Sequence, residues 1–240
     1  MVSDIIKNCA CIKISLHPLA FVRRFGILCG MERLTLQVGT FEVNCSILSA
    51  AGKAWLVDPG QEADRLLAQL KARRLTPTGI LLTHAHFDHV GAVAGLQQAF
   101  PGLPVYVHPL DVPVITHPFN QYPPDYPPVP MPKNVVGCLD AWTLESGEKV
   151  EVIETPGHTP GGVSFYFPPS ASHDGPPLLL SGDTLFAGSV GRTDLPGGDM
   201  ATLVASLKKL AALPHDTVVV PGHGPETTIG AERRANPFLR

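Results

Sequence analysis

The sequence has few charged side chains and no long apolar run. Only 16% of its 240 residues are charged, its formal net charge is -3, and Lys and Arg form no stripe. Nothing therefore favours binding to nucleic acid, which needs a basic surface. No apolar run approaches the roughly 20 residues that span a bilayer, so we expect no membrane partner. A hydrophobic fraction of 44% is typical of a globular protein.

Cysteine pairs at metal-binding or redox spacing are also missing. The number of cysteines is odd and none are separated by two residues, which favours neither a disulfide framework nor a cysteine zinc site. Free cysteines are usually buried, reduced thiols, so we expect a cytoplasmic protein. The five cysteines are Cys9, Cys11, Cys29, Cys45 and Cys138.

Residues 1–30 differ from the rest of the chain. They carry Lys7, Lys13, Arg23 and Arg24 against one acidic residue, Asp4. Their apolar stretch is short and broken, so they do not form a secretory signal. They are either a basic leader or translated sequence upstream of a start at Met31. We favour the second reading, expect no catalytic role for this segment, and predict a single domain over residues 31–240.

Hydrophobic patterns after Met31 predict strands ahead of helices, twice over. This order favours an α/β (α+β) fold with two sheets packed face to face and helices outside.

Residues 109–132 are rich in proline and predict a long surface loop, in which Tyr122 and Tyr126 either line a substrate cleft or belong to an exposed connector. We expect strands at 34–38, 43–48, 53–57, 79–82, 150–153, 163–167, 178–181 and 217–220, and helices at 63–75, 90–100 and 200–213, the last capped by Asp199.

The strongest single feature is the motif His84-Ala85-His86-Phe87-Asp88-His89. In an extended chain His84, His86 and Asp88 alternate and point the same way. His89 joins them only if the chain turns, as it would on entering a helix at Val90. Imidazole and carboxylate ligands suit zinc, manganese or iron. The motif therefore predicts a divalent metal site.

Three more candidate ligands share one context. An apolar strand breaks at a glycine, and His158, Asp183 or His223 follows directly. Taken with the motif, four strand ends presenting ligands predict one rim of the sheets where they converge. The remaining histidines lack this context, and we assign them to structural roles: His17, His108, His117, His173 and His215.

These seven side chains are too many for one tetrahedral metal and suit two. Metals roughly 3.5–4 Å apart lower the pKa of a shared water and polarise a carbonyl or phosphoryl oxygen. Asp88 is also a candidate proton acceptor. No Gly-x-Ser-x-Gly nucleophile motif is present, so the sequence predicts a hydrolase that uses activated water.

From about Met31 onward, these residues resemble the metallo-β-lactamase superfamily, whose fold is a four-layer αββα sandwich. The resemblance implies that His84, His86 and His158 hold one metal, that Asp88, His89 and His223 hold the other, and that Asp183 bridges. We favour zinc, with iron or manganese as alternatives. True β-lactamases of this fold typically have Cys or Ser in place of Asp183, which disfavours antibiotic hydrolysis.

Within that superfamily the chain looks like the glyoxalase II-like (hydroxyacylglutathione hydrolase) enzymes. The stretches that carry this likeness are 181–186, 191–194 and 221–227. The likeness implies that Arg192 binds a glutathione carboxylate, although an exposed loop ion pair is the alternative. Full-length relatives of this type have a helical C-terminal domain that supplies much of the glutathione site. Only residues 224–240 follow His223, so we expect that domain to be missing.

The leading hypothesis is hydrolysis of a small-molecule thioester such as S-lactoylglutathione by a metal-bridging hydroxide. The first alternative is a persulfide dioxygenase-like enzyme with one iron, for which His84, His158 and Asp183 would suffice. The second is a metal-binding module without turnover.

Overall fold

The computed structural model describes residues 31–121, 127–137, 141–143, 149–169 and 175–239. The segment 1–30, with the start predicted at Met31, lies outside the described residues, as do Tyr122 and Tyr126. The predicted domain boundary therefore stays a prediction.

Alternating apolar residues build the first sheet. Leu34, Leu36 and Val38 all point inward from its first strand, as their spacing predicts. The first three strands are antiparallel and the remaining pairs are parallel. The sheet order is β1 (Glu32–Val38), β2 (Val43–Ala50), β3 (Lys53–Val57), β4 (Thr76–Leu81), β5 (Val105–Val107) and β6 (Val135–Gly137).

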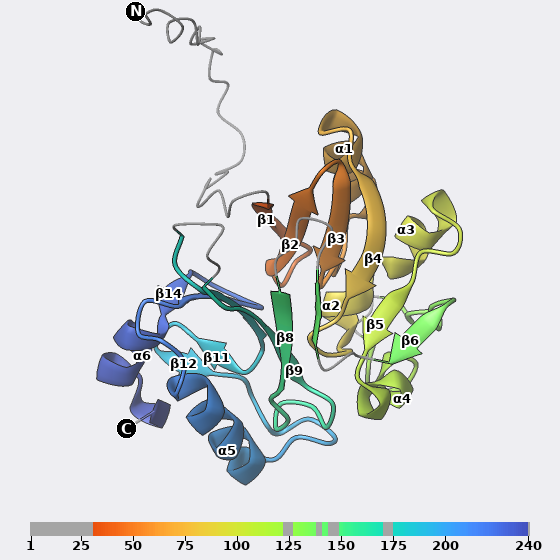
Figure 1. The fold of residues 1–240 in the computed structure, drawn as a ribbon. Helices are drawn as coiled ribbons and strands as arrows, with labels where there is room; N and C mark the ends of the chain where they lie inside the picture. Colours follow the sequence, from red (N-terminus) through yellow and green to blue (C-terminus); the bar gives the residue numbers. More distant parts are fainter. Residues whose placement is uncertain (1–30, 122–126, 138–140, 144–148, 170–174, 240) are drawn as a thin grey trace, which may run out of the picture.

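The second sheet packs against the first, as Figure 1 shows, and has six strands in the described ranges. Its β10–β13 pair is parallel, and the other pairs are antiparallel. The sheet order is β14 (Thr227–Thr228), β13 (Val218–Pro221), β10 (Leu178–Gly182), β9 (Val163–Phe167), β8 (Lys149–Glu154) and β7 (Ala141–Thr143). A separate hairpin pairs β11 (Leu185–Phe186) with β12 (Ser189–Val190).

Helices cover the outer faces of both sheets. Asp199 caps α5 by accepting a hydrogen bond of 2.7 Å from the Thr202 backbone N–H, as predicted. Among the helices in the described ranges, none has the length and apolar character needed to cross a membrane. The helices are α1 (Ala63–Ala72), α2 (Phe87–Val90), α3 (Val93–Ala99), α4 (Val112–Ile115), α5 (Met200–Ala211) and α6 (Ile229–Ala235), with 3-10 turns η1 (Pro109–Asp111) and η2 (Pro237–Leu239).

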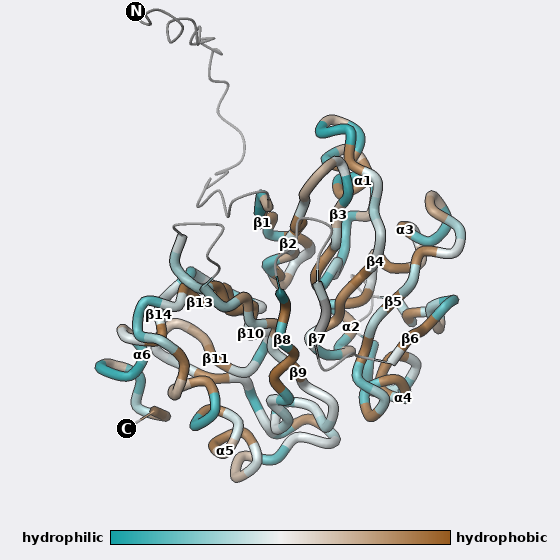
Figure 2. The backbone as a smooth tube through the Cα atoms, viewed as in Figure 1, coloured by the Kyte–Doolittle hydropathy of each residue, from teal (hydrophilic) through white to brown (hydrophobic). Residues whose placement is uncertain are grey.

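Three apolar layers separate these elements. Leu48, Leu81 and Phe165 belong to the layer between the sheets. A second layer joins the first sheet to α1 and α3, and a third joins the second sheet to α5. Figure 2 shows hydrophobic stretches along strands such as β4 and β9. The arrangement is the four-layer αββα sandwich, so the predicted fold is confirmed.

The predicted helix at 90–100 is wrong in its start and its continuity. The helix predicted from Val90 begins instead at Phe87 and is interrupted before α3. The interruption arises because the Ala92 N–H donates to the Pro59 carbonyl (2.9 Å) in the neighbouring loop, not to the preceding turn.

The proline-rich segment is also not a plain surface loop. It carries η1 and α4, since proline is compatible with the first turn of a helix. Asp111, Ile115 and Asn120 are buried, so this segment packs into the domain.

Candidate metal centre

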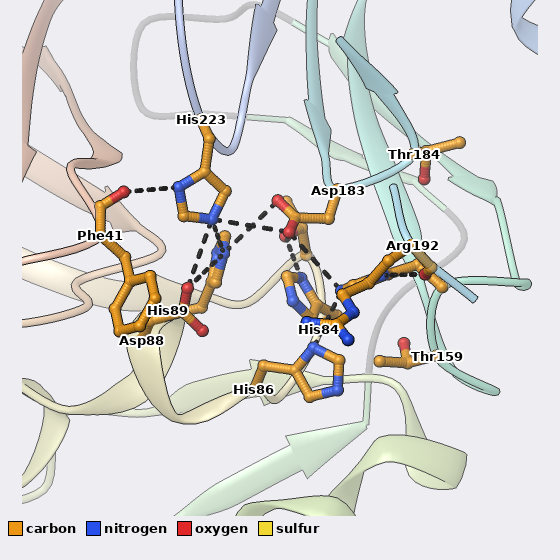
Figure 3. A network of polar contacts seen from close by, with 12 residues as sticks. Phe41, His84, His86, Asp88, His89, Thr159, Asp183, Thr184, Arg192 and His223 are labelled. Atoms are coloured by element: carbon orange, nitrogen blue, oxygen red, sulfur yellow. Dashed lines mark hydrogen bonds and ion pairs between the residues drawn. The ribbon is translucent and has the colours of Figure 1, made fainter. Parts of the chain in front are cut away.

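The histidine motif follows β4, and its backbone turns at the edge of the first sheet. His84 and His86 are buried, and His86 precedes the first residue of α2. Asp88 and His89 therefore lie on one helical turn. The turn needed to include His89 comes at Phe87, earlier than predicted, and all four side chains face one place (Figure 3).

Three other strand ends bring the remaining candidates to the same place. His158 follows β8, Asp183 follows β10 and His223 follows β13. The seven predicted side chains form overlapping groups whose nitrogen and oxygen atoms lie within 4.8 Å of one another in each group. These groups are His84, His86 and His158; Asp88, His89 and His223; and His84, His89 and Asp183.

Asp183 lies between the first two of these groups. Its Oδ2 is 3.5 Å from His158 Nε2 and 3.5 Å from His223 Nε2. Its Oδ1 is 3.5 Å from His89 Nε2. One carboxylate thus reaches both groups, which is the placement required of a bridging ligand.

Several buried atoms in this cluster have no hydrogen-bond partner. They include His84 Nε2 and Asp183 Oδ1. Buried polar atoms are nearly always paired, because leaving one unpaired costs about 1–3 kcal/mol. Divalent metal ions bound by these donors would satisfy them, so the residues present fit a centre for zinc, iron or manganese.

Backbone carbonyls fix the orientation of two imidazoles. His158 Nδ1 donates to the Arg192 carbonyl (2.7 Å), and His223 Nδ1 donates to the Phe41 carbonyl (2.7 Å). Each contact sets the tautomer and leaves Nε2 available to a metal.

Asp58 is a residue that the sequence did not single out. Its Oδ2 lies 3.1 Å from His89 Nδ1, at the distance of an ion pair. The carboxylate also accepts hydrogen bonds from the Thr83 backbone N–H (2.8 Å) and hydroxyl (2.6 Å). Asp58 thereby supports the two ends of the histidine motif.

Asp111 supports the motif from the other side. It accepts hydrogen bonds from Ala85 N–H (3.0 Å), the Thr159 hydroxyl (2.8 Å) and Gly161 N–H (2.6 Å). Its carboxylate joins the motif to the loop that carries His158. The Asn120 side chain also supports the motif. It accepts a hydrogen bond from the Phe87 N–H (2.8 Å) and donates one to the Ala85 carbonyl (2.8 Å).

The pKa shifts of His84, His86 and Asp88 favour the forms that bind cations. Burial holds the pKa of His84 well below its usual range, and burial with the neighbouring His158 lowers the pKa of His86 to about 3. Burial opposes ionisation of Asp88, but His89 and His223 lower its pKa to about 2. Burial alone would lower the pKa of His89, yet Asp183 and Asp88 raise it to about 10. Neutral imidazoles and ionised carboxylates are the forms that bind metals, so His89 has to release its proton when a metal binds.

A cavity of about 420 Å³ opens over the cluster. Arg192, predicted to bind substrate, lines it, with a side chain that is 61% exposed and paired with Asp194 through two contacts of 2.6 and 2.7 Å. The position of Arg192 is thus compatible both with binding a substrate carboxylate and with an exposed loop ion pair. The lining residues are Phe41, His86, Phe87, Asp88, His158, Asp183, Phe186, Ser189, Val190, Arg192, Leu195 and His223.

The other histidines in the described ranges have structural contacts. His108 accepts a hydrogen bond from Leu110 N–H at the start of η1, and His215 contacts Arg233. His117 accepts from Phe119 N–H. His17 and His173 lie outside the described residues.

Comparisons with known proteins agree with this geometry. The chain is 36% identical over 213 residues to the hydroxyacylglutathione hydrolase GloC of Haemophilus influenzae, covering 85% of this chain and 96% of that protein. Among solved structures it is similar to TTHA1623 in a di-iron-bound form (43% identity, TM-score 0.72, 85% and 99% of the two chains). It is also similar to the BLEG-1 B3 metallo-beta-lactamase (38% identity, TM-score 0.75, 85% and 98% of the two chains).

The sequence pattern of the metallo-beta-lactamase superfamily matches residues 38–223, from the end of β1 to the last histidine of the cluster. The fold, the ligand-bearing strand ends and this match agree. The chain therefore belongs to the metallo-beta-lactamase superfamily.

Proposed function

We propose that this protein is a dinuclear metal-dependent hydrolase of thioesters such as S-lactoylglutathione, with zinc as the favoured metal. The observation that carries the proposal is the position of Asp183, which contacts a histidine of each group at 3.5 Å. The similarity to a hydroxyacylglutathione hydrolase supports the substrate class. A cytoplasmic location is part of this proposal, because unpaired cysteines are usually reduced thiols.

The residues of the site have separate roles in this proposal. Two bound divalent cations would lower the pKa of a shared water toward about 7 and polarise the thioester carbonyl. Asp88 lines the cavity, so in this proposal its carboxylate binds a metal and is also the candidate proton acceptor. Arg192 stands at the cavity wall, where a guanidinium can pair with a substrate carboxylate.

The second group of ligands separates this proposal from its alternatives. A persulfide dioxygenase-like enzyme with one iron needs only His84, His158 and Asp183, and leaves Asp88, His89 and His223 without a use. A metal-binding module without turnover leaves the open cavity above the cluster without a use. The hydrolase uses both features.

A substrate panel with metal analysis tests the proposal. We expect the metal-loaded protein to cleave S-lactoylglutathione faster than a lactone or a β-lactam, and to lose at least about 100-fold of that rate after chelation. Zinc should restore it. Undiminished cleavage by the chelated protein would refute metal dependence. Oxygen consumption on glutathione persulfide would favour the dioxygenase, and two bound metals with no turnover would favour the binding module.

Gly222 gives a further test of the site geometry. A Cβ at this position would lie 2.1 Å from Asp183 Oδ1 and 2.9 Å from His89 Cε1. We expect Gly222→Ala to displace Asp183 and weaken zinc binding by about 10–100-fold, the usual effect of disturbing the residues around a metal. A competition titration against a chromophoric chelator measures the change.

Gly137→Ala in β6 is the matched control, because a Cβ there meets nothing within 4 Å. We expect this variant to bind zinc like the parent. Equal zinc affinity in both variants would show that the crowding at Gly222 does not act on the metal ligands.

A further inference from the structure

The cavity over the cluster has an apolar end. Phe41, Phe87 and Phe186 all line it, and they come from three separate elements: the turn between β1 and β2, helix α2 and strand β11. The rings of Phe41 and Phe87 pack edge to face with centroids 5.6 Å apart. The Phe186 ring lies 6.2 Å from that of His223. The three rings thus gather beside the group formed by Asp88, His89 and His223.

The opposite end of the cavity carries a basic side chain. Arg192 lies there, and its carbonyl accepts the hydrogen bond of His158 from the other ligand group. Figure 3 shows Phe41 and Arg192 on opposite sides of the histidine cluster. Of the described residues that line the cavity, Arg192 alone is a Lys or Arg, and its charge is already paired with Asp194. This wall offers one partly neutralised cation to an anionic substrate.

Phe41 is one of the exposed large hydrophobic residues in the described ranges. Its side chain is 38% exposed, and of the large hydrophobic residues exposed in the described ranges it is the one that lines this cavity. Apolar surface at a concave site next to convergent polar groups is typical of ligand-binding pockets. The exposed ring of Phe41 can therefore contact a bound ligand.

Resting on the proposed function, we propose that the preferred thioester has an apolar acyl group, aromatic or branched. The acyl group packs against Phe41, Phe87 and Phe186, and the carbonyl lies over the ligand cluster. The thiol half, with its carboxylate, points toward Arg192. A hydroxylated acyl group such as lactoyl is then a poorer fit than an aromatic one, because its hydroxyl would be buried against three rings.

A series of glutathione thioesters that differ only in the acyl group tests this proposal. We expect kcat/KM for the phenylacetyl thioester to exceed that for the acetyl and lactoyl thioesters by about tenfold or more, the scale on which an apolar pocket discriminates between ligands that differ in apolar size. We expect Phe186→Ala and Phe41→Ala to lower the ratio of phenylacetyl to acetyl kcat/KM by about tenfold. The metal content of each variant is measured alongside, and Phe41→Leu replaces Phe41→Ala if metal is lost.

Phe238→Ala is the matched control, because Phe238 is 41% exposed but does not line the cavity. Its ratio should equal that of the parent. Equal kcat/KM across the acyl series, or a lactoyl preference, would overturn the apolar pocket while leaving the proposed hydrolase intact. Failure to cleave any thioester by protein with two bound metals would refute the proposed function itself.

Discussion

Replacing Asp183 with alanine is expected to lower kcat/KM for the thioester by about 1,000-fold, or roughly 4 kcal/mol of transition-state stabilisation. Asp183 touches His158, His223 and His89 at 3.5 Å each. Its loss removes a carboxylate that reaches both candidate groups. The bound metal should fall from about two ions per chain to one or fewer. Elemental analysis and steady-state kinetics on the same sample measure both effects.

Two companion variants make this result interpretable. Asp183→Asn keeps the shape of the side chain but removes the charge, so it separates the effect of charge from that of volume. Asp216→Ala removes an exposed carboxylate outside the cluster and should leave rate and metal content unchanged. If Asp183→Ala kept two metals and the parental rate, the bridging role assigned to Asp183 would be wrong.

Asp111→Ala should have the largest effect on stability. The side chain is wholly buried and accepts hydrogen bonds from Ala85, Thr159 and Gly161. Alanine would leave three donors without a partner, at about 1–3 kcal/mol each. Since the cavity left behind can admit water, we expect a total loss of about 3–5 kcal/mol in the free energy of unfolding. Denaturant titration of the metal-free protein measures it without interference from metal loss.

The same substitution should also weaken metal binding. Asp111 joins the loop that carries His84 and His86 to the loop that carries His158, so its removal frees both sets of ligands to move. We expect zinc affinity to fall about 10–100-fold. Asp111→Asn retains one acceptor oxygen and should lose less of both quantities. An unfolding free energy within about 0.5 kcal/mol of the parent, the range usual for surface changes, would contradict the role given to Asp111.

The cluster of candidate metal ligands could be predicted from the sequence because its signals are local. His84, His86, Asp88 and His89 lie within one short motif, and His158, Asp183 and His223 each follow a strand that breaks at a glycine. Strand periodicity also predicted the buried face of β1, and the position of Asp199 ahead of an amphipathic pattern predicted the N-cap of α5. Each of these features is determined by residues close together in the sequence, so hydrophobic periodicity and turn-forming residues are enough to predict it.

The residues that support the ligands could not be predicted in this way. Asp58 sits in a segment that has the pattern of a strand-closing turn, and Asp111 and Asn120 lie among prolines. Each acts through contacts with segments far away in the sequence, such as that between Asp111 and Gly161. A single sequence holds no record of such contacts. The interruption between α2 and α3 was missed for a related reason, because the Ala92 N–H donates to the Pro59 carbonyl in another loop.

Restoring activity to the metal-free protein tests the dinuclear centre most directly. Chelated protein is titrated with zinc while thioester hydrolysis is followed at each addition. Because two complete ligand groups meet at Asp183, the expected rate rises until about two equivalents of zinc per chain are bound and then stays constant. A plateau at one equivalent, or full activity before any zinc is added, would contradict a dinuclear hydrolase.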